Sequence, residues 1–504
     1  MTEAVVDLAV VGAGPAGLSA AVVAAEHGLR VELVDAGAQT GGQFWRHPDE
    51  NHLDDFAAPE HTGHHHWGHY VDLRARLARQ VAQGRVRHRS GRQVWRTDRI
   101  DDAIVLRTTA VVCADTTPLA ERALTARRLV LATGAYDRQL PVPGWTLPGV
   151  MAAGGVQALL KANQVRAGRR AVVAGTGPFL LSVAAGLASA GVEVVAVCEA
   201  NALSRWAATP LRALHEPGKL WEGVGYAGTF LRHRIGLRTR TVVTAVQGEV
   251  RATGVQTARV DGAGRLVPGT ERTIDADLVA FGWGFTPQLE LAVGLGLRTR
   301  IDLDESLIVD VDDLQRTSDP AVYAAGETTG IGGAVQSCAE GELAALAVVA
   351  DLGGGVDARR IAARRRRIRR GRTFAVGMHR ASPVPVGWAD WLTPQTVVCR
   401  CEEVTAAEIT RTVCDLAADD ARDVRVTARP GMGLCQGRVC GFGLSQLVAA
   451  QTGTAPDAAA LEALTNRHVG VPVALGDLAA LLPPPNRDAD LVEAAAAHHD
   501  KEQP

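Results

Sequence analysis

The sequence predicts an α/β protein in which two dinucleotide-binding folds precede a small helical domain. Three observations support this class: a glycine-rich turn near residue 12, a second one near residue 175, and paired cysteines near residues 400 and 437. With 504 residues and 47% hydrophobic residues, the chain can build two or three domains with large cores.

Charge and hydropathy argue against several functions. The formal net charge is -2, so nothing in the composition favours nucleic acid or an anionic membrane as a partner. No apolar run is long enough to span a bilayer, and no basic N-terminal region leads into a signal-type apolar segment. We therefore expect a cytoplasmic protein whose thiols are reduced or ligated.

The first fold begins with an apolar run over residues 5–11, which is typical of a buried parallel strand. A helical run over 18–27 and a strand over 31–35 follow, so the glycine turn lies in a complete βαβ unit. The first glycine of such a motif makes the tight turn, the second lets the backbone approach a pyrophosphate, and the third lets helix and strand pack closely. The acid at the end of the second strand can hydrogen-bond a ribose. The alternative is a chance glycine-rich turn. The predicted cofactor-binding residues of this unit are Gly12, Gly14, Pro15, Ala16, Gly17 and Asp35.

Three further segments could complete this cofactor site. Glycines at 41 and 42 would let a loop run under a cofactor, although an ordinary turn is an equal alternative. A strand over 129–134 and another over 321–327 end in small-residue turns, and a helix is expected over 335–352. Free N–H groups at that helix start would favour a phosphate or a flavin carbonyl. The candidate residues are Gly42, Gln43, Thr133, Gly134, Gly326 and Glu327.

A second β-turn-helix unit begins at residue 170. Gly175 and Gly177 open its turn, and Glu199 ends the next strand, which would suit an unphosphorylated ribose and hence NAD. Leu180 stands at the third glycine position. A bulky residue there changes helix–strand packing, so the site is either altered, empty or a working NAD(P) site.

Two segments carry unusual composition. Residues 47–69 contain seven histidines, and a solvated loop is favoured over a metal site because Pro, Gly and acids are interspersed. Residues 359–372 contain nine arginines, and we expect a solvated helix that links two domains. The alternative is a docking surface for an acidic partner subunit. No aromatic residues interleave with the arginines, which argues against nucleic acid.

The cysteines near the C-terminus form a C-x-C and C-x4-C pattern of Cys399, Cys401, Cys435 and Cys440. Thiolates are the usual ligands of [2Fe–2S] clusters, and neighbouring glycines could point N–H groups at the sulfurs. Zinc and unligated thiols remain alternatives, since zinc sites favour two residues between paired cysteines. The residues Thr405–Glu408 form a capping box, and Ile409, Val413 and Leu416 should line one face of the helix that follows. Cys414 should be a core thiol.

The first 350 residues resemble the two-dinucleotide-domain flavoproteins of the glutathione reductase type. The segments that carry this resemblance are 12–17, 132–134, 282–287, and 317–320 with 325–327. In that group the last segment contacts the FAD ribitol, usually through an aspartate, and here Glu327 stands at that position. No C-x-x-C or C-x4-C disulfide follows the first helix, which argues against a disulfide reductase.

A closer resemblance covers nearly the whole chain and rests on residues 132–138, 143–151, 330–333 and 399–404. These segments look like the α (flavin/iron–sulfur) subunits of heteromeric amine and opine dehydrogenases. Octopine and nopaline dehydrogenases, hydrogen cyanide synthase and dye-linked L-proline dehydrogenase belong to that family. The C-terminal domain resembles bacterioferritin-associated ferredoxin, which implies a [2Fe–2S] cluster on Cys399, Cys401, Cys435 and Cys440.

The resemblance also implies cofactors and partners. It implies FAD in the first fold, a β subunit related to D-amino acid oxidase that oxidises the substrate C–N bond, and an additional FMN between subunits. Electrons would pass from the partner through the cluster and the flavin bound here to an acceptor. The sequence shows no general acid–base pair or activated nucleophile, so no catalytic residue is assigned. Two other hypotheses are a self-contained NAD(P)H-dependent FAD/[2Fe–2S] reductase and a flavoprotein binding module with a zinc or docking domain.

We expect six segments. They are a first FAD-binding part (1–150), an inserted NAD(P)-like domain (151–275) with a strand-rich stretch over 220–275, the FAD-domain return (276–352), an Arg-rich helix and linker (353–394), the [2Fe–2S] domain (395–455), and a C-terminal segment with an acidic tail (456–504).

Overall fold

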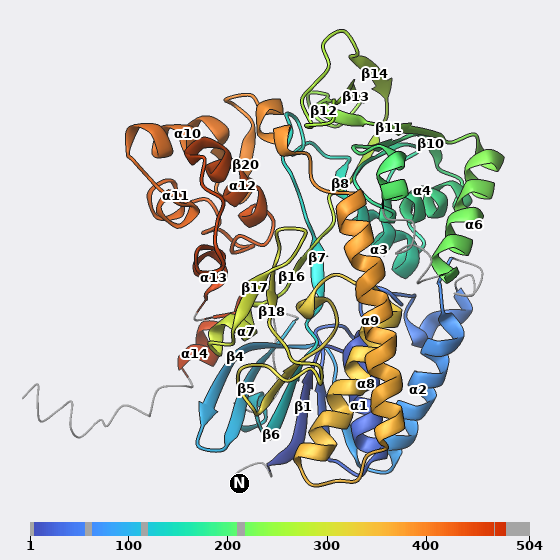
Figure 1. The fold of residues 1–504 in the computed structure, drawn as a ribbon, viewed down its shortest axis with the longest axis vertical. Helices are drawn as coiled ribbons and strands as arrows, with labels where there is room; N and C mark the ends of the chain where they lie inside the picture. Colours follow the sequence, from blue (N-terminus) through green and yellow to red (C-terminus); the bar gives the residue numbers. More distant parts are fainter. Residues whose placement is uncertain (1–4, 56–62, 112–118, 209–216, 468, 480–504) are drawn as a thin grey trace, which may run out of the picture.

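The computed structural model describes residues 5–55, 63–111, 119–208, 217–467 and 469–479. Two sheets lie one above the other in Figure 1, and the C-terminal domain stands beside them at the upper left. The predicted acidic tail and Cys113 lie outside the described residues.

The first sheet has the order β3-β2-β1-β6-β5-β4, and β19 also pairs with β6. Strands β1, β2, β3, β6 and β19 are parallel, whereas β4 and β5 add an antiparallel edge. The strands are β1 (Val6–Val11), β2 (Val31–Val34), β3 (Val86–Arg89), β4 (Arg92–Ile100), β5 (Ala103–Ala110), β6 (Ala123–Leu131) and β19 (Val322–Ala324). Because β1, β6 and β19 run in the same direction, their carboxyl ends meet at one edge, and the segments predicted to bind a cofactor follow them there.

Helix α1 (Pro15–Glu26) is buried on almost every side. It lies between the first sheet and two further helices, α2 (Trp67–Ala82) and α8 (Ala334–Asp351). Residues 16–25 are all buried, so this part of the helix has no polar face.

The second sheet is entirely parallel, with the order β11-β10-β9-β15-β8. Its strands are β8 (Val150–Ala152), β9 (Arg170–Gly175), β10 (Glu193–Glu199), β11 (Gly236–Thr239) and β15 (Leu278–Gly282), and its helices are α3 (Ala153–Asn163), α4 (Phe179–Ser189) and α6 (Pro217–His233). Together the two sheets make an α/β fold with two dinucleotide-binding units.

The prediction of a strand-rich stretch over 220–275 is wrong in its first part. Helix α6 extends to His233, because Phe230 and Tyr226 are spaced by four residues and pack together against the second unit. The antiparallel sheet that follows consists of β12 (Thr241–Gln247), β13 (Gly254–Arg259) and β14 (Arg272–Asp275).

Two short ribbons connect the units. Strand β7 (Ala135–Asp137) pairs with β16 (Phe285–Pro287), and β17 (Thr299–Ile301) pairs with β18 (Leu307–Val309). Helix α7 (Glu290–Gly294) follows β16.

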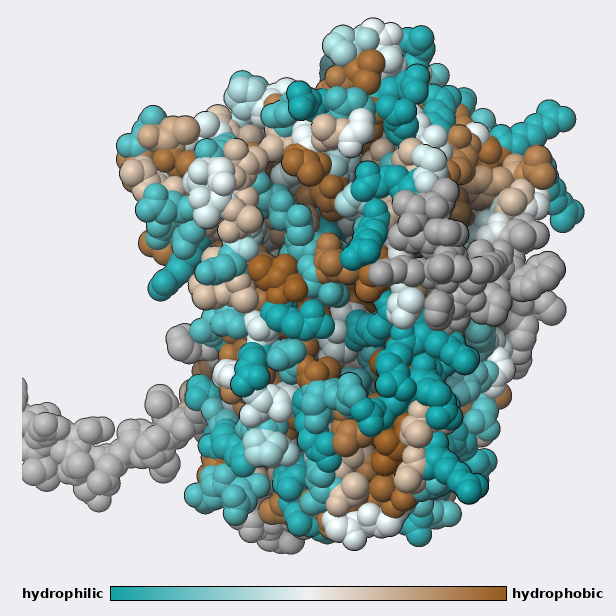
Figure 2. Space-filling view, in the orientation of Figure 1, coloured by the Kyte–Doolittle hydropathy of each residue, from teal (hydrophilic) through white to brown (hydrophobic). Residues whose placement is uncertain are grey.

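The Arg-rich segment forms the long helix α9 (Ala358–Ala381), which runs past both units in Figure 1. Figure 2 shows hydrophilic residues over much of its length. One face is nevertheless anchored on α8, since Arg360 and Arg364 bind Glu342 at 3.2 and 2.9 Å and Arg372 binds Glu340 at 2.8 Å. The helix is therefore more than a solvated link.

The stretch over 383–394, expected as a linker, contains a buried 3₁₀ segment, Val386–Trp391. Trp388 is 2% exposed and donates its indole N–H to the carbonyl oxygen of Pro141 at 3.0 Å. This short segment contains two tryptophans, Trp388 and Trp391, and both are buried. Burial of two such large side chains favours a packed segment over an extended, solvated linker.

The C-terminal domain is mostly helical. Its elements are β20 (Val397–Cys399), β21 (Val404–Thr405), α10 (Ala406–Asp415), α11 (Ala421–Ala428), α12 (Gly441–Thr452), α13 (Ala458–Thr465) and α14 (Leu475–Ala479). The capping box is confirmed, since Thr405 and Glu408 exchange both hydrogen bonds. The hydrophobic core of the C-terminal domain is continuous with that of the second sheet, because Ile409 and Leu444 belong to one hydrophobic cluster with Val172 and Phe281.

Two expectations for helix α10 are wrong. Cys414 is exposed rather than part of the core, and Leu416 is 59% exposed. Ile409 and Thr412 mark the buried face, and Cys414 lies five residues after Ile409, which places it on the other side of the helix. Leu416 lies beyond the last helical residue, so it cannot continue the apolar face.

Across the described ranges, no helix combines the length and apolar character needed to cross a membrane.

Candidate functional site

One large cavity of about 1380 Å³ lies between the two dinucleotide units. Most of the residues predicted to bind a cofactor line it: Gly12, Gly14, Pro15, Ala16, Asp35, Gly42, Gln43, Thr133, Gly134, Gly326, Glu327 and Gly177. The cavity exceeds the usual range of small-molecule pockets, about 300–1000 Å³. Gly17 and Gly175 do not line it, because their role is packing.

The first glycine turn is built for close backbone approach. Gly12 has φ +100°, and a Cβ there would overlap the carbonyl oxygen of Ala132 on the neighbouring strand. A Cβ at Gly17 would overlap the carbonyl oxygen of Gly12, so helix α1 can reach the strand only through glycine.

Asp35 holds this turn in place. Its carboxylate accepts the backbone N–H of Ala13 at 2.5 Å and that of Gly37 at 2.6 Å. Burial raises the pKa of Asp35, against the lowering effect of those two hydrogen bonds. Each carboxylate oxygen keeps a further lone pair, so the same group can also accept a ribose hydroxyl from the cavity.

The loop after β2 lies directly on the turn. Gly42 has φ +58°, and a Cβ there would come within 2.8 Å of the Gly14 Cα. The N–H of Gly41 donates to the carbonyl oxygen of Ala13 at 2.9 Å. Two glycines are needed because two backbone segments pass each other without room for side chains.

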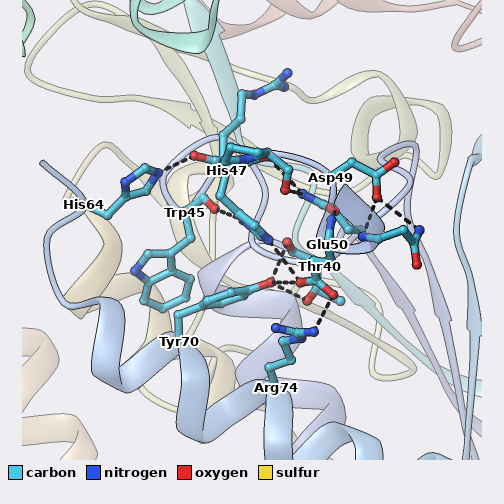
Figure 3. A network of polar contacts seen from close by, with 12 residues as sticks. Thr40, Trp45, His47, Asp49, Glu50, His64, Tyr70 and Arg74 are labelled. Carbon is cyan, nitrogen blue, oxygen red and sulfur yellow. Dashed lines mark hydrogen bonds and ion pairs between the residues drawn. The ribbon is translucent and has the colours of Figure 1, made fainter. Parts of the chain in front are cut away.

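A polar network anchors this loop to helix α2 (Figure 3). The two ring nitrogens of His47 lie 2.6 Å from the carbonyl oxygen of Trp45 and 3.0 Å from the Glu50 carboxylate. Arg74 binds the same carboxylate at 2.7 Å, and the Tyr70 hydroxyl donates to it at 3.1 Å. A carbonyl and a carboxylate oxygen both accept, so each ring nitrogen of His47 is positioned to donate.

The charge of Glu50 is favoured by its partners. Burial favours the protonated acid, but the His47 hydrogen bond and the charge of Arg74 lower its pKa. The expectation of a solvated histidine loop is therefore wrong for His47 and His64, which are 3% and 7% exposed. His47 packs against Trp67 and Tyr70 of helix α2, and His64 packs against Trp67 and hydrogen-bonds to the carbonyl oxygen of Arg46, contacts that composition alone does not reveal. Residues 56–62 of this segment lie outside the described residues.

The other end of the cavity is closed by the start of helix α8. Glu327 accepts the N–H of Gly333 at 3.0 Å, and burial raises the pKa of Glu327 to about 7. Sequence reasoning missed Glu340, which is 1% exposed and accepts the N–H of Gly326 at 2.8 Å. Two acids on one buried helix, at 340 and 342, facing an Arg-rich segment were the available signal.

The second glycine turn repeats the design of the first. Glu199 accepts the N–H of Gly177 at 2.8 Å and that of Asn201 at 2.9 Å, as Asp35 does with its own turn. Leu180, at the third glycine position, is 1% exposed and packs against Gly282, whose lack of a side chain makes room for it. The glycine needed for close packing therefore lies on the neighbouring strand.

The four C-terminal cysteines gather on β20, two loops and the start of α12. The Cys399 sulfur accepts a hydrogen bond from the Cys440 thiol and another from the N–H of Gly431 at 3.3 Å. These bonds lower the pKa of Cys399 to about 5. The pKa of Cys440 is raised by its bond to Cys399 and by burial. A backbone hydrogen bond from Cys435 lowers the pKa of Cys401, but burial and the hydrogen bond with the Cys435 side chain outweigh it and raise that pKa.

The four thiols thus form two adjoining pairs, and charge on Cys401 and Cys435 also acts on Cys440. No group of three or more His, Cys, Asp or Glu side chains among the described residues is arranged to hold a single metal ion. Four thiols with a backbone N–H directed at one sulfur are a donor set that could hold an iron–sulfur cluster or a zinc ion.

One wall separates the cavity from the cysteine domain. Arg138 lines the cavity, and its guanidinium lies 3.8 Å from the centre of the Phe442 ring on α12. It is held by Asp304 at 2.8 Å. Farther along the same segment, Trp145 donates to the carbonyl oxygen of Val397 at 2.6 Å, close in the chain to Cys399.

The two sheets with their parallel strands, the paired glycine turns and the cavity between them define a flavoprotein with two dinucleotide-binding units. The pyridine nucleotide-disulphide oxidoreductase family matches residues 6–341, and the chain belongs to this family. The protein is an FAD-dependent oxidoreductase.

Relatives extend over nearly the whole chain. The chain is 30% identical to hydrogen cyanide synthase subunit HcnB of Pseudomonas protegens, over 86% of this chain and 89% of that protein. It is 32% identical to an opine oxidase subunit of Rhizobium meliloti, over 94% of this chain and 87% of that protein. The L-proline dehydrogenase of P. horikoshii shares the fold with a TM-score of 0.64 and 16% identity, over 94% of this chain and 79% of that chain.

Proposed function

We propose that this protein is the flavin- and iron–sulfur-carrying subunit of a heteromeric dehydrogenase. A partner β subunit, related to D-amino acid oxidase, would oxidise an amine, imino acid or opine C–N bond. The present chain would carry the electrons onward. Two of its relatives are named as subunits, one of opine oxidase and one of hydrogen cyanide synthase, which supports membership of a multi-subunit enzyme.

The observation that carries the proposal is the shared wall between the cavity and the cysteine domain. Arg138 lines the cavity on one side and stacks on Phe442 on the other. Cys440 directly precedes the helix that carries Phe442. Two redox sites that share one wall are arranged for electron transfer between them.

The residues of this chain would bind and orient the cofactors. A bound flavin accepts two electrons and can release them singly, and a [2Fe–2S] cluster on the four cysteines takes one at a time. The first glycine turn and Asp35 would hold the dinucleotide, and Glu327 would face the ribitol. Gly431 would donate to a ligating sulfur. An additional FMN would lie at the interface with the partner.

The cofactor content of anaerobically purified protein tests this proposal. We expect about two irons, two acid-labile sulfides and one FAD per chain, because one [2Fe–2S] cluster supplies the iron and the sulfide. Flavin without iron, in a preparation never exposed to oxygen, would contradict the relay, and stoichiometric zinc would make the cysteine domain a structural or docking module. Copurification of the tagged chain with a flavin-bearing β subunit is the second arm. A fully active lone chain would contradict the heteromer.

A self-contained NAD(P)H-dependent reductase is the second candidate. The parallel between Glu199 with Gly177 and Asp35 with Ala13 favours it, because both units offer the same ribose-binding arrangement. Anaerobic addition of NADH distinguishes the two. Rapid bleaching of the flavin by NADH would support the reductase, and an unchanged flavin spectrum would exclude it.

A further inference from the structure

Three arginines lie near the loop that carries Cys435 and Cys440. Arg438 lies between Cys435 and Cys440 in the chain, and it donates to the carbonyl oxygen of Cys435 at 3.4 Å. Arg467 donates to the carbonyl oxygen of Gln436 at 2.9 Å, one residue further along the same loop. Arg425 is close enough to Cys440 for their charges to interact.

One carboxylate partly balances these arginines. Glu290, at the start of α7, is 6% exposed and binds Arg438 at 2.6 Å through one oxygen. Its other oxygen is buried without a hydrogen-bond partner among the described residues. Glu402 lies on the exposed side, where Arg429 pairs with it at 3.2 Å and balances its charge. The charge of Glu290 thus acts on Arg438 and Arg467, and Arg425 lies beside Cys440.

The arginines are incompletely satisfied by the part of the chain that the structure describes. The Nε atoms of Arg425 and Arg467 are buried there and have no hydrogen-bond partner. Burial, followed by repulsion from Arg425, lowers the pKa of Arg467 to about 10. Buried charges of one sign are unfavourable unless an opposite charge lies among them. The groups positioned to supply that charge are the cysteine thiolates.

The same arginines connect the cysteine loop to the flavin cavity. Tyr136 lines the cavity, and the charges of Glu290, Arg438 and Cys435 all act on its phenol. Gln288, two residues before Glu290, also lines the cavity, and its carbonyl oxygen accepts the hydroxyl of Thr133 at 2.7 Å. The Glu290–Arg438 pair therefore joins the cavity wall to the loop between Cys435 and Cys440.

We infer that Arg425, Arg438 and Arg467 form a basic shell that raises the reduction potential of the cysteine-bound centre, with Glu290 opposing it and positioning Arg438. The inference rests on the proposed [2Fe–2S] cluster. When the reduced flavin gives up one electron, the centre gains one negative charge, and no bond is formed or broken. Nearby positive charge stabilises that added electron, and net charge is one determinant of iron–sulfur potentials.

The midpoint potential of the cluster tests this inference. It is measured by anaerobic redox titration of the full-length holoprotein at a fixed, mildly alkaline pH, followed by electron paramagnetic resonance. In Arg438→Gln and Arg467→Gln we expect the midpoint potential to fall by at least about 59 mV, which corresponds to a tenfold change in the one-electron redox equilibrium constant. In Glu290→Gln we expect a shift of opposite sign. Arg411→Gln, an exposed arginine on α10 of the same domain, is the control and should leave the potential unchanged.

Iron content separates charge from folding. If Arg467→Gln loses iron, Arg467→Lys should retain it and keep the parent potential, because it preserves the charge. The inference is overturned if the glutamine variants keep both iron and the parent potential, if Arg411→Gln shifts as much as they do, or if the lysine variant also loses iron. A parent protein without iron and sulfide would overturn the proposed function together with this inference, whereas an iron-replete parent with unresponsive variants overturns the inference alone.

Discussion

At the scale of single residues, the site depends on positions where no side chain fits or where a charge is buried. Gly12, Gly17 and Gly42 allow backbone segments to touch around the first turn. Asp35 and Glu327 line the cavity and Glu340 is buried on α8, and all three accept backbone N–H groups. These acids shape the loops that would surround a dinucleotide, and the first two were recognisable from their place after a strand.

Substituting Gly17 by alanine should destabilise the protein and weaken flavin binding. The new Cβ would overlap the carbonyl oxygen of Gly12, so helix α1 must move away from the turn. Overpacking of this kind costs about 1–3 kcal/mol. Urea unfolding and flavin content measure the effect. Gly68→Ala is the matched control, because no atom lies within 4 Å of its added Cβ and alanine favours a helix. Equal loss in both variants would contradict the packing role.

Glu327 should make the stability of the flavin-free protein depend on pH. Burial raises its folded pKa to about 7, above the ordinary value of 4.5. Between these values the folded state binds more protons than the unfolded state, so stability falls as pH rises from 4.5 to 7. We expect Glu327→Gln to reduce this fall, measured as the urea midpoint at the two ends of that window. An identical pH dependence in both proteins would show that Glu327 is not responsible.

At the scale of elements, α9 and the segment after it hold the molecule together. Helix α9 binds Glu340 and Glu342 of α8 through arginines, and the 3₁₀ segment Val386–Trp391 then inserts two tryptophans beneath the cysteine domain. The sequence predicted the helix from its composition. It did not predict the docking, because the acids that bind the arginines lie in another helix.

Trp388→Ala should loosen the cysteine domain. The change removes a buried indole and its hydrogen bond to Pro141, and truncations of buried tryptophan cost about 3–5 kcal/mol. Limited proteolysis should cut the variant within residues 383–394, where the parent protein resists. Val386→Ala is the control, since Val386 is 90% exposed and its truncation should change stability by less than about 0.5 kcal/mol. Resistance of both variants to proteolysis would contradict the anchoring role.

At the scale of the whole molecule, the two candidate redox sites share a wall but rest on different structural supports. The first glycine turn and the start of α8 line one side of the cavity and the second glycine turn lines the other, whereas the cysteine domain shares its core with the second sheet. Arg138 and the Glu290–Arg438 pair cross between them. Loss of one cofactor should therefore first affect the part of the fold that surrounds that cofactor.

Removal of metal should open the cysteine domain and leave the flavin in place. Cys399 and Cys440 are 1% and 2% exposed and belong to the core, so the loss of a bound centre leaves two sulfur groups buried there without their ligand. After treatment with a chelator and reductant, we expect new proteolytic cleavage within 395–455 and unchanged flavin absorbance. Simultaneous loss of flavin and metal would contradict separate supports.

The sequence by itself determined the two dinucleotide units, because glycine turns, apolar strands and terminal acids are local patterns. It also determined the capping box of α10. Tertiary structure alone decided that His47 is buried, that Cys414 is exposed, and that Gly282 rather than residue 180 provides close packing in the second unit. The basic shell likewise appears only in three dimensions, since its three arginines come from separate segments. The physical reason is that burial and charge balance depend on neighbours far apart in the chain, whereas turns and helix caps depend on residues a few positions away.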